Sequence, residues 1–104
     1  MTIMKDAKDL LKKVYKTDEN IITRKILDET ILVPIRGKLA DMQIIFTLNS
    51  VSEYIWDNLN GERTLEDIVN GIKRTFDVKR VVAIEDVSEF IGDLIKENLV
   101  TEVG

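Results

Sequence analysis

The stretch from Leu48 to Thr64 constrains the fold of this chain more than any other, because its residue types mark a strand end, a helix and a turn in quick succession. Asn49 or Ser50 can cap a helix. Ser50 with Glu53 fits a capping box, in which a hydroxyl and a carboxylate bind backbone N–H groups that a helix leaves unpaired. We therefore expect a helix that starts directly after a strand ending near Leu48.

A second helix is expected directly after this stretch. Asn60-Gly61 is typical of a left-handed helix end, and Thr64 with Asp67 opens a new helix. The residues that follow carry apolar side chains on one helical face: Leu65, Ile68, Val69, Ile72 and Phe76. This stripe predicts a core-facing helix from Leu65 to Phe76.

Three β-rich segments precede the first of these helices. Ile21 to Leu27 and Thr30 to Ile35 are predicted to form a hairpin joined at Asp28-Glu29. Pro34 has no amide proton, so it is expected at a strand end or an edge position. A third strand is expected from Met42 to Leu48, in which Met42, Ile44, Phe46 and Leu48 alternate with Gln43, Ile45 and Thr47.

The N-terminus is predicted to be a short amphipathic helix that forms its own unit, residues 1–17. Its apolar residues recur at helical spacing: Ile3, Met4, Ala7, Leu10, Leu11 and Val14. We expect it to dock on the domain or on a second copy of the chain, giving a homodimer. Asp6 and Asp9 disfavour a membrane-surface helix. Asp18 to Asn20 is predicted to link this unit to a domain of residues 21–104.

The last predicted helix, from about Val82 to Asn98, has an unusually wide apolar face. At 100° per residue its apolar side chains cover an arc of roughly 140°. They are Phe90, Ala83, Leu94, Val87, Ile91, Ile84 and Ile95. Such an arc fits either a helix with two neighbours or a broad core-facing helix. The closing segment, Leu99 to Val103, is expected to tuck against the core.

The composition excludes most catalytic chemistry. The 104 residues contain no cysteine and no histidine, which removes thiolate nucleophiles, imidazole bases and the usual zinc ligands. The adjacent carboxylate pairs lie at predicted turns and helix starts, where caps explain them. We therefore expect a protein that is not an enzyme and holds no metal and no cofactor. Its apolar runs are far shorter than the ~20 residues that span a bilayer, so a cytoplasmic location is expected.

The distribution of charge along the chain argues against DNA binding. Three strands with three helices fit a winged helix-turn-helix, whose commonest use is DNA binding. Residues 1–40 carry a net charge of +3, from nine basic and six acidic side chains, and residues 41–104 carry −7, from six basic and thirteen acidic ones. The would-be recognition helix carries Glu85, Asp86 and Glu89, which would repel phosphate. A winged-helix DNA-binding or regulatory protein is thus the alternative, and no nucleic-acid partner is expected.

The downstream half of the chain resembles the PqqD family, the peptide chaperones of pyrroloquinoline quinone (PQQ) biosynthesis. The resemblance covers roughly Ile21 to Val103. It rests on the joint order of Leu48-Asn49, Ile55-Trp56, Leu59, Gly61, Thr64, Ile68, Phe76, Asp86-Val87, Phe90-Ile91, Leu94 and Leu99-Val100. It implies an α+β, winged helix-turn-helix-like fold: a three-stranded antiparallel sheet followed by three helices, here with an extra N-terminal helix.

The resemblance also implies a function as a recognition element of ribosomally synthesised and modified peptides (RiPPs). Such a chaperone binds the leader of a precursor peptide as an added strand on the third strand and presents it to a radical SAM/SPASM maturase. PQQ is one of several possible products. The peptide-binding residues expected on this basis are Met42, Gln43, Ile44, Ile45, Phe46, Thr47, Val87, Phe90, Ile91 and Leu94.

Overall fold

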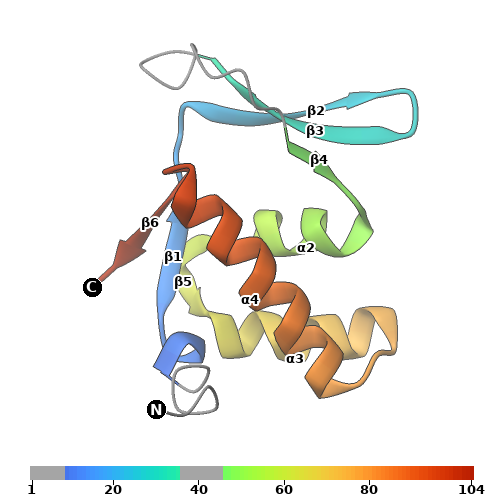
Figure 1. Cartoon of the computed structure of the whole chain (residues 1–104), viewed down its shortest axis with the longest axis vertical. Coiled ribbons are helices and arrows are strands. Elements are labelled where there is room, and N and C mark those ends of the chain that lie inside the picture. Colours follow the sequence, from blue (N-terminus) through green and yellow to red (C-terminus); the bar gives the residue numbers. More distant parts are fainter. Residues whose placement is uncertain (1–8, 36–45) are drawn as a thin grey trace.

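A computed structural model describes residues 9–35 and 46–104 of the chain. Its elements are, in order, β1 (Val14–Thr17), β2 (Ile21–Ile26), β3 (Glu29–Pro34), β4 (Phe46–Leu48), α2 (Ser50–Asn58), β5 (Asn60–Thr64), α3 (Leu65–Phe76), α4 (Arg80–Lys96) and β6 (Val100–Val103). Two three-stranded sheets form, ordered β2-β3-β4 and β5-β1-β6. Figure 1 shows α4 running from the end of α3 up toward the sheet of β2, β3 and β4.

The first sheet confirms the predicted antiparallel arrangement that precedes three helices. In the hairpin, Ile21 pairs with Pro34 and Ile26 with Glu29, so Pro34 lies at a strand end as predicted. The turn is Leu27-Asp28, one residue earlier than expected, and Leu27 adopts a left-handed φ of 58°. β4 adds antiparallel to β3. The first four residues of the predicted third strand, 42–45, lie outside the described part of the chain.

The start of α2 confirms Asn49, one of the two predicted caps, and the predicted position of the helix directly after a strand. Asn49 is its N-cap, and the Oδ1 atom of Asn49 accepts a 2.8 Å hydrogen bond from the Ser52 backbone N–H. The capping box of Ser50 and Glu53 is therefore wrong. The Glu53 carboxylate instead accepts a 3.3 Å hydrogen bond from the Thr30 hydroxyl of β3. This contact ties the start of α2 to the hairpin sheet.

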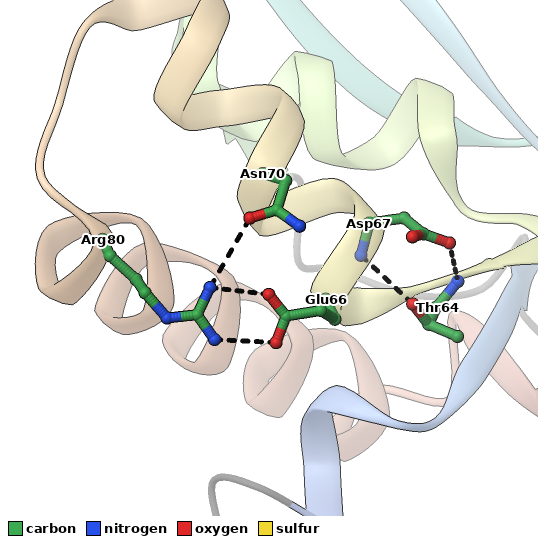
Figure 2. Close-up of polar contacts among 5 residues, drawn as sticks. All are labelled: Thr64, Glu66, Asp67, Asn70 and Arg80. Carbon is green, nitrogen blue, oxygen red and sulfur yellow. Dashed lines mark hydrogen bonds and ion pairs between the residues drawn. The ribbon is translucent and has the colours of Figure 1, made fainter.

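The start of α3 confirms the predicted cap. The Thr64 hydroxyl accepts from the Asp67 N–H and the Asp67 carboxylate accepts from the Thr64 N–H, both at 3.1 Å (Figure 2). The helix bounds match the prediction. The Asn60-Gly61 pair, however, lies within β5 and does not end α2, whose C-cap is Leu59. Gly61 does adopt the left-handed φ, at 83°.

α4 begins at Arg80, two residues earlier than predicted. Arg80 donates two hydrogen bonds to the Glu66 carboxylate, of 2.6 and 2.7 Å, and a third of 3.5 Å to the Asn70 amide oxygen (Figure 2). The pair joins the first turn of α4 to the first turn of α3. The guanidinium group presents two parallel N–H groups to the carboxylate. This contact therefore fixes the orientation of Arg80 relative to Glu66 as well as the distance between them.

The second sheet was not predicted and corrects the N-terminal prediction. Residues 9–11 are helical, but Val14 belongs to the strand β1 and not to the helix. β1 is central in its sheet, with β5 on one side and β6 on the other. The closing segment thus pairs as β6. The separation of residues 1–17 from residues 21–104 stays a prediction, although residues 14–17 share this sheet with both later strands.

One hydrophobic core joins the helices to both sheets. α3 contributes Leu65, Ile68, Val69 and Ile72, which are all almost completely buried. Leu11 and Tyr15 extend the core toward the second sheet, and burial raises the pKa of the Tyr15 phenol. Trp56 is a buried core anchor of α2.

Gly71 in α3 and Gly92 in α4 allow this packing to be tested by the same substitution at a crowded and at an open position. A Cβ at Gly71 in α3 would collide with the Tyr54 hydroxyl and lie 2.9 Å from Cζ of that ring, which packs edge-on against Phe76. A Cβ at Gly92 in α4 would meet nothing within 4 Å. We expect Gly71→Ala to lower the free energy of unfolding by about 1–3 kcal/mol. Gly92→Ala should raise it by up to about 1 kcal/mol, because alanine favours a helix. Urea unfolding measures both, and equal effects would contradict the collision.

The stabilisation that the ion pair of Arg80 and Glu66 provides is expected to depend on pH. Hydrogen bonding to Arg80 lowers the pKa of Glu66 from its ordinary value of 4.5, against a smaller opposing effect of burial. A lowered pKa means that this stabilisation is present above pH 4.5 and is lost as the pH falls through the lowered value. We expect Arg80→Gln to raise the pKa of Glu66, measured by NMR titration of its side-chain carboxyl carbon. Arg74→Gln is the control and should leave it unchanged.

Candidate functional site

An open groove lies between β4, the start of α2 and one face of α4. Its volume is about 220 Å³. The strand and helix start contribute Phe46, Thr47, Asn49, Val51 and Ser52, and α4 contributes Asp86, Glu89, Phe90 and Asp93. Segments almost 40 residues apart in sequence therefore form its two walls.

The rotation of α4 about its axis decides which side chains reach the groove. Val87, Ile91 and Leu94 are almost completely buried, so this side of the helix faces the core. Asp86 and Asp93 are seven residues apart, nearly two full turns, and therefore project in almost the same direction. They project roughly 100° away from the buried side. Phe90 lies at the border between the two sides and contacts both the core and the groove.

The structure places the sequence-predicted residues in three groups. Phe46, Thr47 and Phe90 line the groove together. Val87, Ile91 and Leu94 lie in the core and do not line it. Met42, Gln43, Ile44 and Ile45 lie outside the described part of the chain.

Six groove residues were absent from the predicted set: Asn49, Val51, Ser52, Asp86, Glu89 and Asp93. The helix cap at Asn49 indicates that its neighbours lie at a strand–helix junction. The three acidic residues follow one another at spacings of three and four residues, which places them on one helical face, and Asp86 and Asp93 have the same spacings from Phe90. That spacing is visible in the sequence and could have identified them.

The groove combines an apolar part with an acidic one. Phe46, Val51 and Phe90 supply aromatic and aliphatic surface, and each is at least half-buried. Asp86, Glu89 and Asp93 are exposed and form no ion pair with any residue in 9–35 or 46–104. No basic side chain from that part of the chain lines the groove.

Within residues 9–35 and 46–104, β4 also has an edge beside the groove that pairs with no other strand, called its free edge below. In the order β2-β3-β4, β4 pairs with β3 on one side, and no other described strand pairs with it. Its Thr47 side chain is exposed and lines the groove. An unpaired strand edge presents backbone N–H and C=O groups to which an extended peptide can bind.

Among residues 9–35 and 46–104, no group of three or more acidic side chains is arranged to hold a metal ion. Within the same ranges, no helix has both the length and the apolar content needed to cross a membrane. Two other hollows in the described part of the chain are larger, about 460 and 600 Å³, but neither is lined by residues of β4.

Comparisons with known proteins identify the family of this chain. A family model described as "Coenzyme PQQ synthesis protein D (PqqD)" matches residues 29–100. A search of curated proteins gave no match to this sequence.

Two solved structures resemble the fold closely. One is TbiB1 in complex with the TbiA(beta) leader peptide, with a TM-score of 0.64 and 25% identity, covering 82% of this chain and 93% of that one. The other is lasso peptide synthetase B1 complexed with the leader peptide, with a TM-score of 0.65 and 15% identity, covering 84% of this chain and 96% of that one. The second match supports the fold alone.

Substitutions at two neighbouring residues of α4 test which side chains belong to the core and which to the groove. Leu94 is completely buried, whereas Asp93 is exposed on the groove. We expect Leu94→Ala to lower the free energy of unfolding by about 2–5 kcal/mol, through lost burial and the cavity that remains. Asp93→Asn should change it by no more than about 0.5 kcal/mol. Chemical denaturation of both variants measures this contrast, and a large loss for Asp93→Asn would place Asp93 in a structural role.

Proposed function

This chain belongs to the PqqD family, and on that premise we propose that it binds the leader segment of a ribosomally synthesised precursor peptide. The leader adds as a strand to the free edge of β4, and its side chains enter the groove between β4 and α4. The observation that carries this proposal is the free edge of β4 directly beside that groove. The leader complex of the structurally similar TbiB1 supports it.

Leader binding at micromolar affinity requires contributions from both the strand edge and the groove. A strand of the predicted length, Met42 to Leu48, would form about five backbone hydrogen bonds with the leader, a net ~5 kcal/mol, while ordering a disordered peptide costs ~2 to 5 kcal/mol. The edge alone is therefore too weak. Burying two or three apolar leader side chains, at ~1.5 to 3 kcal/mol each, brings the total near the ~8 kcal/mol of micromolar binding. Phe46, Val51 and Phe90 supply apolar surface for such side chains.

We assign no catalytic step to this chain. It acts by holding the leader while the rest of the precursor reaches a separate modifying enzyme, which we propose to be a radical SAM/SPASM maturase in the cytoplasm. Binding both molecules raises the local concentration of the peptide at the active site. The maturase supplies the chemistry.

The DNA-binding alternative is less compatible with the surface of α4. Its exposed acidic residues include Glu85, Asp86 and Glu89, which would lie beside phosphates in a major groove. A homodimer through the N-terminal residues stays a separate proposal, and size-exclusion chromatography with and without residues 1–13 tests it. That truncation keeps β1 but removes Leu11 from the core, so circular dichroism first establishes that the shortened chain is folded.

Peptide binding is tested by NMR of the ¹⁵N-labelled chain, titrated with the synthetic leader of a candidate precursor at low and high salt. We expect amide shifts in Phe46–Leu48 and around Asp86, Phe90 and Asp93 that persist at high salt. A leader with proline at alternate positions lacks the needed N–H donors and is the control, which should bind far more weakly. Shifts absent from this groove, together with saturable, salt-sensitive shifts on adding duplex DNA, would overturn the proposal.

A further inference from the structure

The two chemistries of the groove are arranged for a side chain that is apolar along its stem and charged at its tip. Phe90 lies between the acidic residues of α4 and the core, and Phe46 faces the same groove from β4. Asp86 and Asp93 flank Phe90 at four and three residues, which places them about one helical turn away on either side. A stem that rests on Phe90 therefore brings its tip between two carboxylates.

The acidic wall also has the length of a short extended peptide. From Asp86 to Asp93 the helix rises about 10.5 Å, at 1.5 Å per residue. In an extended strand, side chains on one face repeat about every 6.7 Å. One or two leader residues on a given face therefore meet the wall at the same time.

We propose that this groove selects leader peptides with a lysine or arginine side chain directed at Asp86, Glu89 and Asp93. The inference rests on the proposed function, whose site it refines. A lysine or arginine stem covers aromatic surface while its charged end stays near solvent. The guanidinium or ammonium group then donates hydrogen bonds to the carboxylates, and charge assistance makes these bonds stronger than neutral ones.

The alternatives fit this groove less well. A leader with an acidic side chain at this position would meet three like charges, and no basic residue of the described chain lines the groove to offset them. A purely apolar side chain would gain contact with Phe46 and Phe90 but would leave the carboxylates without partners. The charge is also local to the groove wall, so a basic residue elsewhere in the leader would not gain the same contacts.

The test selects peptides from a phage-displayed library of random dodecapeptides against three forms of the full chain. These are the wild type, the groove variant D86N/E89Q/D93N and the control variant E29Q/E62Q/E85Q. Both variants remove three negative charges, but the control carboxylates are exposed and lie outside the groove. Circular dichroism establishes that each variant is folded. NMR shift mapping with the selected peptides identifies those that bind at the groove.

We expect groove-binding peptides selected by the wild type and the control variant to be enriched in lysine or arginine at one or two fixed positions. The groove variant should lose this enrichment. Replacing that lysine by norleucine in a resynthesised peptide should weaken its binding to the wild type about ten- to hundred-fold and change its binding to the groove variant little. The norleucine comparison on the wild type decides the matter even if the groove variant does not fold.

Two negative outcomes separate the inference from the proposed function. Peptides that bind at the groove without basic enrichment, or with equal affinity for lysine and norleucine, would overturn the basic-residue inference and leave peptide binding intact. If no selected peptide shifts residues of β4 or of the groove face of α4, both the inference and the proposed function fail.

Discussion

The groove depends on how α4 is held against the core. Ala83, Val87 and Leu94 are completely enclosed, which fixes the rotation of the helix about its axis. Turning the helix by one residue, about 100°, would bring carboxylates into an apolar interior at a cost of several kcal/mol each. The pair of Arg80 and Glu66 further ties the start of α4 to α3. The core thus determines which face of α4 is opposite β4.

The sequence predicted those elements that are determined by nearby residues. The bounds of α3 follow from Thr64, Asp67 and an apolar stripe, all within 13 residues. The second sheet could not be predicted in this way, because β1 pairs with strands about 45 and 86 residues further along. Leu10, Leu11 and Val14 also fit a helical spacing, although Val14 is in a strand. At α2, both Asn49 and Ser50 are good caps, and Glu53 is held by the distant Thr30.

The residues of the groove could also be predicted only in part from the sequence. A wide apolar arc on α4 correctly indicates that the helix contacts more than solvent, but it does not say which residues face the core. In the structure, Val87 and Ile91 pack inside, and Phe90 reaches the groove from the border of the arc. From the sequence alone, the acidic residues beside Phe90 indicate only that this helix would repel the phosphates of DNA. Their position opposite β4 emerges from the packing of segments almost 40 residues apart.

Affinity and selectivity come from different parts of this site. Hydrogen bonds along a strand edge can be made by any extended peptide, so in the proposed binding mode the groove residues are what distinguishes one leader from another. Asp86, Glu89 and Asp93 lie three and four residues apart on an exposed face, where like charges destabilise a helix by about 0.2–0.5 kcal/mol per pair. In the proposed binding mode, a cationic leader side chain would relieve that repulsion, and it would bind only the folded form. Binding therefore stabilises the helix that carries half of the groove, in addition to the contacts that the leader makes.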